Sequence, residues 1–265
     1  MSFLVNPYWY GSSVCTDTDA LAFLSAAAIT DPTITSAICT LVTSMKADGT
    51  WTKCSAIYPM VGGTATTHKF NLKNPADTNA AFRLSFVGGW THSSNGALPN
   101  GTNAYANTFL LPVTILGTNT HSFGIYSRTN DTIGTKVYGA ISATSASADI
   151  LHNNLTGANF NSGAVANGVI YTANPTTSLL MASRTSNTLF QAYRAGVSLG
   201  TNTTALASIP NINFYFGARN SNGTAQFFTT HQLAFAFLGG ALNTTEAAAL
   251  YTSVQAFQTT LSRQI

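Results

Sequence analysis

The chain has 265 residues, enough for one large all-β domain, and only 7% of them are charged, against about 25% in an average soluble protein. Eleven Lys and Arg stand against eight Asp and Glu, a formal charge of +3, and the basic residues are spread singly. Without a basic run or a basic helix face, nucleic acid is excluded as the expected partner, and no apolar window of about 18 residues predicts a membrane span.

The chain begins with an apolar and aromatic arm, "FLVNPYWY". Asn6 and Pro7 interrupt its apolar run and no early Lys or Arg precedes it, so it does not resemble a cleaved secretory signal. The arm has no partner within its own segment. We therefore expect it either to dock on a neighbouring protein or to form an edge strand of the main fold. Its large side chains are Phe3, Leu4, Tyr8, Trp9 and Tyr10.

Two short helices are predicted after the arm. The segment "TDTDALAFLSAAA" opens with capping residues and places Leu21, Leu24 and Ala28 on one face of a helix over about 17–28. Asp31 and Pro32 then begin a second helix, which Gly49 ends. Its apolar face is predicted from 3.6-residue spacing as Ile34, Ile38, Leu41, Val42 and Met45.

Three cysteines lie in the first fifth of the chain: Cys15, Cys39 and Cys54. Their number is odd and no pair has CxxC spacing, so we expect all three to act as small apolar residues. One disulfide among them is the alternative. No His lies at zinc-ligand spacing from any pair, which argues against a metal site on these thiols.

From about 65 to 240 the chain reads as short strands. Runs rich in β-branched and aromatic residues, such as "TFLLPVTIL" (108–116), "INFYFGARN" (212–220) and "HQLAFAFLGG" (231–240), alternate with Gly, Asn and Pro turns. This spacing predicts a sandwich of antiparallel sheets. We expect residues 1–60 to be an arm and two-helix leader, and residues 61–265 to be the sandwich.

The last predicted element is a helix opened by Asn243 and Glu246, the only glutamate of the chain. Asn at the cap and Glu three residues later form an Asn version of the capping box, which gives this carboxylate a role without a substrate. The apolar face is predicted to carry Ala247, Leu250, Val254, Phe257 and Leu261, with Arg263 on the polar side.

Three segments carry a resemblance to a known fold: "GALPNGTNAYANT" (96–108), "TLFQAYRAGVSLG" (188–200) and residues 212–251, which begin "INFYFGARN". Together they resemble the laminin-G-like, concanavalin A-like lectin/glucanase jelly roll over about residues 65–255. The resemblance implies a mostly β antiparallel jelly roll, here with a helical leader and a C-terminal helix. Because that fold hosts lectins, glycosidases, adhesins and structural modules, it implies no single function.

The leader carries a second resemblance. The segment "WTKCSAIYPMVGGTATTHKFNLKNP" (51–75) is similar to the front of proteins encoded by bacteriophages and prophages. This implies a non-enzymatic virion structural protein, for example a head decoration, a fibre or a tail-associated protein. It would be assembled in the host cytoplasm, with other virion proteins or copies of itself as partners.

Catalysis and metal binding have little support in the sequence. A glycosidase needs two carboxylates about 5 to 9.5 Å apart, and no predicted strand carries acidic residues at i, i+2 or i+4. No GxSxG segment supports a nucleophilic triad. We expect no cofactor. A structural calcium is a weak alternative at Asp131 with Asn130, or at Asp77 with Asn74 and Asn79, but such residues more often form turns.

Carbohydrate binding is the alternative function, as an adhesin module that recognises a host surface glycan. Sugars are held by aromatic faces together with amides, guanidinium groups and backbone groups on loops. The candidates are Trp90, His92, Tyr105, Arg219, Asn220 and Asn222. The competing interpretation is that Trp90 and Tyr105 fill the core and that "RNSNG" is only a turn.

Overall fold

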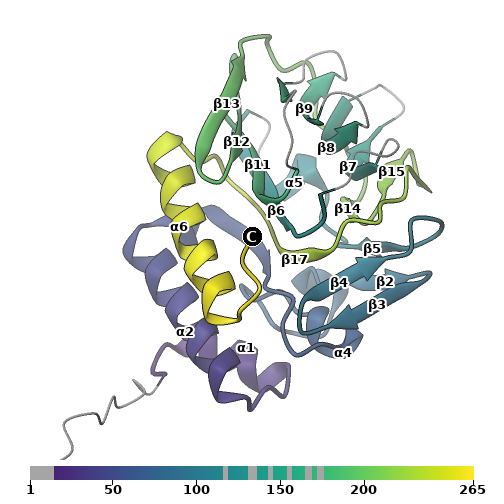
Figure 1. The fold of residues 1–265 in the computed structure, drawn as a ribbon. Coiled ribbons are helices and arrows are strands. Elements are labelled where there is room, and N and C mark those ends of the chain that lie inside the picture. The colour runs from purple at the N-terminus through teal and green to yellow at the C-terminus, as the bar shows by residue number, and fades with distance from the viewer. Residues whose placement is uncertain are drawn as a thin grey trace, which may run out of the picture.

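The computed structural model describes residues 15–115, 119–130, 136–142, 146–153, 157–164, 169–171 and 176–265. The predicted arm residues Phe3, Leu4, Tyr8, Trp9 and Tyr10 lie outside this range, and so does Asp131. The described chain forms three layers: a helical layer, an eight-stranded sheet and a nine-stranded sheet (Figure 1).

The helices lie mostly at the two ends of the chain. The long ones cover one side of the fold in Figure 1: α1 (Thr18–Ala26), α2 (Pro32–Ala47) and α6 (Thr244–Thr260). The short ones are α3 (Thr50–Lys53), α4 (Ala65–His68), the 3-10 turn η1 (Asn79–Ala81) and α5 (Pro112–Ile115).

The eight-stranded sheet has the order β13-β12-β11-β6-β17-β4-β3, with β1 also paired to β17. All its pairs are antiparallel. Its strands are β1 (Cys54–Tyr58), β3 (Trp90–Ser93), β4 (Gly96–Pro99), β6 (His121–Ser127), β11 (Ser178–Ser186), β12 (Leu189–Arg194), β13 (Val197–Asn202) and β17 (Leu233–Gly239).

The nine-stranded sheet has the order β10-β9-β8-β7-β14-β5-β2, with β15 beside β7 and β16 beside β15. Its pairs are antiparallel except β15 with β7, which is parallel. Its strands are β2 (Ser85–Val87), β5 (Tyr105–Asn107), β7 (Lys136–Ile141), β8 (Ala146–Asn153), β9 (Gly157–Ala164), β10 (Val169–Tyr171), β14 (Tyr215–Phe216), β15 (Arg219–Ser221) and β16 (Thr224–Gln226).

Two apolar cores explain why the central strands are buried along their whole length. One core lies between the helices and the eight-stranded sheet and includes Phe23, Leu41, Phe235 and Phe257. The other lies between the two sheets and includes Phe123, Tyr138, Phe160 and Phe216. Every residue of β6 and of β17 is therefore buried. The predicted mostly β antiparallel sandwich with a helical leader and a C-terminal helix is confirmed.

The predicted leader and the predicted sandwich pack together and share one sheet. Strand β1 comes from the predicted leader, yet it pairs with β17, as Tyr58 with Ala236 shows. Helix α6 packs against α2, and Ser253 Oγ donates to Asp48 Oδ2 at 3.1 Å. The division of the chain at residue 60 stays a prediction. Residues on both sides of it contribute to one common core.

The cysteine prediction is wrong for two of the three residues. Cys15 and Cys39 form a disulfide, with Cα atoms 5.8 Å apart, which ties the start of α1 to α2. Their spacing in sequence carried no sign of this pairing, because packing of the two helices creates it. Cys54 is buried and free, as expected, and burial raises the pKa of its thiol to about 12.

Three local predictions also need correction. The run "TFLLPVTIL" is not a strand: Pro112 begins the short helix α5, since proline cannot donate to a sheet ladder. Helix α1 buries Ala20, Phe23 and Leu24, whereas Leu21 is 43% exposed. Helix α6 ends at Thr260 and Ser262 adopts φ +54°, so Arg263 turns inward and is 1% exposed.

The capping box at α6 is confirmed and predicts two contrasting mutants. Glu246 N donates to Asn243 Oδ1 at 3.0 Å, Asn243 N donates to Glu246 Oε2 at 2.8 Å, and Lys53 Nζ lies 3.3 Å from Glu246 Oε1. Asn243→Ala should cost about 1 kcal/mol of unfolding free energy. Glu246→Gln keeps the box and loses only an exposed ion pair, so it should cost less than about 0.5 kcal/mol.

Urea unfolding of both variants measures the difference. Equal losses in the two variants would contradict the assignment of Glu246 to the cap.

Candidate functional site

One row of residues crosses the outer face of the nine-stranded sheet, the face turned away from the sandwich core. Asn107 pairs with Ser85 on one side and with Tyr215 on the other, and Tyr215 pairs with Gly139. Phe214 and Phe216, the neighbours of Tyr215 in sequence, lie in the core between the sheets. Because side chains alternate along a strand, Tyr215 points to the outer face.

Two tyrosines stack on this face. Tyr105 precedes Asn107 by two residues on β5 and reaches Tyr215 diagonally; their ring centroids are 4.6 Å apart and the rings are nearly parallel, at 21°. Burial, and then the neighbouring Tyr105, raises the pKa of Tyr215. Among the described residues neither hydroxyl has a hydrogen-bond partner. Asn107 Oδ1 accepts from Phe109 N, which leaves its amide Nδ2 for another acceptor.

Arg219 forms a second aromatic contact beside the same strands. Its guanidinium lies 4.3 Å from the ring centre of Phe227, and its Nε donates to Ser221 Oγ. Phe227 is 40% exposed. Strand β15 begins at Arg219, whose partner in register is Gly139, the residue that also pairs with Tyr215. Arg219 and the tyrosine pair are therefore anchored at the same point of β7.

The two asparagines predicted beside Arg219 form the β15–β16 turn. Asn220 is buried; its Nδ2 donates to Asn213 O and its Oδ1 accepts from Gly223 N. Asn222 is exposed and adopts φ +49°. The side-chain amide of Asn220 is thus engaged with the backbone, as the turn interpretation expects.

Trp90 and His92 lie at the edge of the sandwich, on β3. The indole N–H of Trp90 donates to Val87 O and Tyr105 O. The indole ring packs directly on Gly217, so closely that a Cβ at that position would lie only 2.7 Å from it. His92 contacts the ring of Phe86 at 4.6 Å. The structure therefore brings Trp90 next to Tyr105, but through the backbone of Tyr105 rather than through a shared surface.

Sequence reasoning missed Tyr215 and Phe227. The segment "INFYFGARN" was interpreted only as a strand. Its alternation gives Tyr215 the face opposite to Phe214 and Phe216, a signal that could have identified it. Phe227 carried no such signal, because it follows the end of β16 and its own φ is +56°, so it is not part of an alternating strand.

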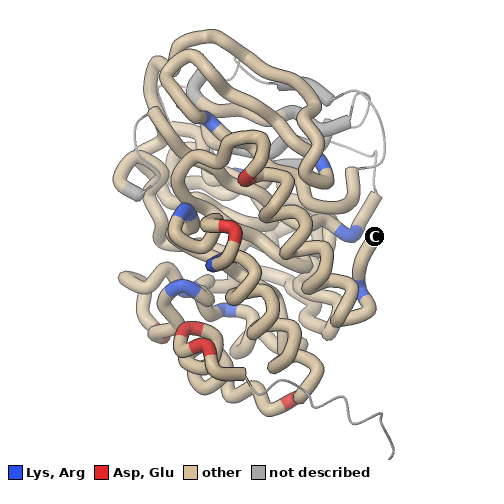
Figure 2. Tube along the Cα trace, turned by 90° about the vertical axis from the view of Figure 1, so that its left-hand side faces the viewer, with Lys and Arg blue, Asp and Glu red and all other residues tan. Residues whose placement is uncertain are grey.

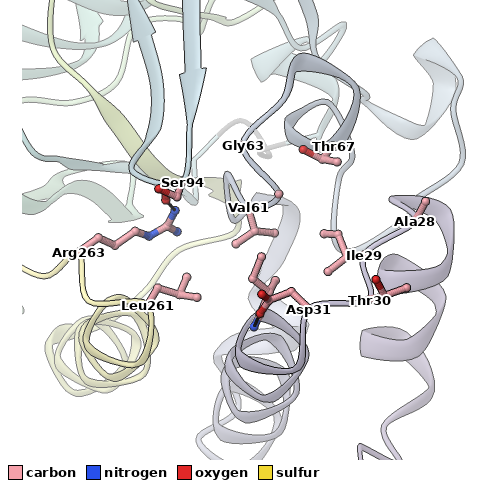
Figure 3. A pocket seen from close by; sticks show the side chains of 12 residues that line it. Ala28, Ile29, Thr30, Asp31, Val61, Gly63, Thr67, Ser94, Leu261 and Arg263 are labelled. Atoms are coloured by element: carbon pink, nitrogen blue, oxygen red, sulfur yellow. Dashed lines mark hydrogen bonds between the residues drawn. The ribbon is translucent and has the colours of Figure 1, made fainter.

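A cavity of about 500 Å³ lies between the α1–α2 connection, residues 61–67 and the C-terminal tail (Figure 3). Ile29, Val61 and Leu261 give it aliphatic walls, and no aromatic ring lines it. Figure 3 shows Arg263 extended toward Ser94 at its edge. Without a ring for a sugar to stack on, this cavity is a poorer carbohydrate site than the tyrosine pair.

The guanidinium of Arg263 is buried without a carboxylate partner among the described residues. Burial, and then the charge of Arg128, lowers its pKa to about 9, so it stays protonated at neutral pH. Its N–H groups are satisfied by neutral oxygens: Nε by Gln258 Oε1 at 2.6 Å, Nη1 by Met60 O at 2.7 Å and Ser94 O at 3.2 Å, and Nη2 by Pro59 O at 2.7 Å and Ala234 O at 2.9 Å.

A Ser–His contact occurs inside the sandwich. His121 Nε2 and Ser162 Oγ are 2.7 Å apart, and Arg184 donates to Ser162 through Nε and Nη2. All three side chains are completely buried, at 0% exposure. A substrate cannot reach this serine in the folded state, so we assign the cluster to structure.

The metal alternatives receive no support within the described segments. They contain no group of three or more His, Cys, Asp or Glu side chains that could hold an ion. Asp131 lies outside them, and Asn130 Oδ1 accepts from Thr176 N. At the second candidate, Asp77 pairs with Lys69 and Arg83, and these hydrogen bonds hold the pKa of Asp77 below its usual value.

Charge is sparse on the folded chain as well. Figure 2 shows the charged residues of the described segments scattered over the fold rather than gathered into one basic band. Helices long and apolar enough to cross a membrane are absent from the described residues.

Comparison with known proteins identifies the fold. No family model and no curated protein matches the chain. Domain 4 of a GH43 extracellular arabinanase from Geobacillus stearothermophilus, solved with arabinotriose, is similar over 75% of this chain and 98% of its own, with a TM-score of 0.50 and 15% identity. The botulinum neurotoxin serotype D binding domain is similar over 76% of this chain, with a TM-score of 0.51 and 9% identity, and the chain spans 52% of that chain. The protein therefore has the fold of these β-sandwich domains.

Proposed function

We propose that the protein is a carbohydrate-binding module in which the half-buried Tyr105 offers its ring to the sugar, while Tyr215, which is only 8% exposed, supports that ring and offers its hydroxyl. The observation that carries this proposal is the stacked tyrosine pair on the outer face of the nine-stranded sheet. An aromatic face packs against the C–H groups of a sugar ring, and phenol hydroxyls without protein partners serve its hydroxyls. Asn107 and Arg219 add an amide and a guanidinium beside the pair.

We propose further that the module binds sugar without hydrolysing it. Six of the eight acidic residues have a structural partner in the described part of the chain: Asp17 and Asp31 cap helices, Asp19 pairs with Lys46, Asp48 with Thr50 and Ser253, Asp77 with Lys69 and Arg83, and Glu246 with Asn243 and Lys53. These residues lie on helices and their caps or in loops, and none is on the strands that carry the tyrosine pair.

Tyr105→Ala is expected to weaken glycan binding at least tenfold, which corresponds to about 1.4 kcal/mol. Titration calorimetry with neutral oligosaccharides, arabinotriose among them, measures the affinity. Tyr215→Phe keeps the stack and removes one hydroxyl, so it should cost about three- to tenfold.

Tyr251→Ala is the control for these variants. This tyrosine is half-buried on α6, in the helical layer, and its loss should leave the affinity unchanged. If Tyr105→Ala binds as well as the unmodified protein, the tyrosine pair is not the site. Release of new reducing ends from any bound oligosaccharide would contradict the non-enzymatic assignment.

We propose that the module is displayed on a virion. The resemblance of residues 51–75 to proteins encoded by bacteriophages and prophages supports this proposal. The low charge of the chain suits packing against copies of itself or other shell proteins through polar and apolar contacts. Deleting residues 1–12 should then reduce self-association or binding to capsid or tail proteins, measured by light scattering and pull-down. Unchanged assembly after the deletion would contradict a role for the arm.

A further inference from the structure

A groove with two cations lies at the β2 edge of the nine-stranded sheet. It has a volume of about 260 Å³, and Lys69, Arg83, Leu84 and Ser85 are among its lining residues. Lys69 follows α4 and Arg83 precedes β2. A backbone hydrogen bond from Leu84 N to Lys69 O, of 2.7 Å, holds the two segments side by side. The fold therefore fixes the two cations next to each other.

One carboxylate serves both cations. Asp77 Oδ2 lies 2.5 Å from Lys69 Nζ and Asp77 Oδ1 lies 2.9 Å from Arg83 Nη1. Asn79 Oδ1 accepts from Arg83 Nε at 3.1 Å. The remaining N–H groups of Arg83 have no partner among the described residues, and its side chain is 35% exposed. The groove thus keeps a net charge of +1 and free guanidinium donors.

The groove continues the row that holds the tyrosine pair. Ser85, which lines the groove, pairs with Asn107, and Asn107 pairs with Tyr215. Neighbouring strands are about 4.8 Å apart, so Ser85 lies about 10 Å from Tyr215 across the sheet. A linear oligosaccharide stacked on the tyrosine pair can therefore extend over Asn107 and Ser85 to the two cations.

We propose that this groove is an acidic-sugar subsite, so that the glycan class bound by the outer face carries a carboxylate such as that of a uronic acid. A carboxylate accepts two parallel hydrogen bonds from a guanidinium, and Lys69 adds a point charge. The inference rests on the proposed carbohydrate-binding function and specifies its ligand.

The test compares acidic oligosaccharides with their carboxyl-reduced counterparts, which keep the linkage and ring shape and lose the charge. The probes are trisaccharides of galacturonic, glucuronic and mannuronic acid. The protein should bind at least one acidic form about fivefold more tightly than its reduced form, the range of an exposed ion pair. This preference should shrink in 1 M salt, where charges more than about 3 Å apart are screened.

Two variants are expected to change the preference for the acidic form in opposite directions. Arg83→Gln should abolish the preference by weakening binding of the acidic form much more than that of the reduced form, because glutamine can still donate to a hydroxyl but carries no charge. Asp77→Asn should increase the preference at least twofold, because it releases both cations from their internal partner. Lys53→Gln, an exposed lysine beside α6, is the control and should change neither affinity.

The outcomes separate this inference from the proposed function. If Tyr105→Ala weakens binding of every probe while Arg83→Gln and Asp77→Asn change nothing, the tyrosine site stands and the acidic subsite is wrong. If Arg83→Gln abolishes binding that Tyr105→Ala leaves intact, the groove is supported and the tyrosine site is wrong. If only neutral sugars bind, the acidic subsite is overturned while the module function stands; if no sugar binds, both fall.

Discussion

Replacing Arg263 with methionine is expected to lower the unfolding free energy by at least about 3 kcal/mol. Methionine keeps much of the apolar stem. It removes the guanidinium N–H groups that donate hydrogen bonds to the carbonyls of Pro59, Met60 and Ala234. Each buried acceptor left without a donor costs about 1 to 3 kcal/mol. Urea unfolding monitored by tryptophan fluorescence measures the loss.

Two further variants test whether the loss comes from the missing hydrogen bonds of Arg263. Arg263→Lys keeps the charge but supplies three donors instead of five, so its loss should be smaller than that of the methionine variant. Arg128→Met is the matched control: Arg128 is half-buried and donates to the carbonyl of Arg263, and its loss should cost about 1 kcal/mol. A methionine variant as stable as the unmodified protein would show that apolar packing replaces this buried charge, as happens for some buried ion pairs.

Acid is expected to destabilise the fold through His68. This imidazole is 1% exposed; burial, and then the charges of His92 and Arg263, lowers its pKa to about 3, whereas the unfolded chain has a pKa near 6.5. The unfolded state therefore binds one more proton between those values. The stabilisation is complete above pH 6.5 and is lost as the pH falls, by about 1.4 kcal/mol per pH unit.

His68→Phe removes this titration while keeping a ring against His92. The Nδ1 atoms of the two histidines share a hydrogen bond of 2.9 Å, which the variant loses, so a cost of about 1 kcal/mol is expected at pH 7. Between pH 7 and pH 4 the variant should lose about 3 kcal/mol less than the unmodified protein, measured by urea unfolding. Parallel loss in both proteins would mean that His68 does not titrate in this range.

Local signals in the sequence predicted local structure well. Asp31 with Pro32 begins α2, and Asn243 with Glu246 begins α6, because a cap needs only neighbouring residues. Features that depend on distant segments were missed. The Cys15–Cys39 disulfide and the pairing of β1 with β17 arise only when two remote parts of the chain pack together.

The candidate site was predicted in part for the same reason. The sequence offers Tyr105 as an aromatic side chain of a loop-borne glycan site, but only the register of β5 with β14 places it on Tyr215. Trp90 was selected for its ring, and its indole N–H is instead bonded to backbone carbonyls. Arg263 was assigned to a polar helix face, because the turn at Ser262 that carries it inward leaves no periodic pattern.

The position of β17 has a consequence for biosynthesis. This strand pairs with β6, β4 and β1, and each of them precedes it by about 100 residues or more, since β6 ends at Ser127 and β17 begins at Leu233. The ribosome therefore synthesises β1, β4 and β6 before β17, and until β17 emerges their apolar faces and edges lack this partner. Such nascent chains fold slowly and aggregate easily, so we expect this protein to depend on chaperones until residue 239 has left the exit tunnel.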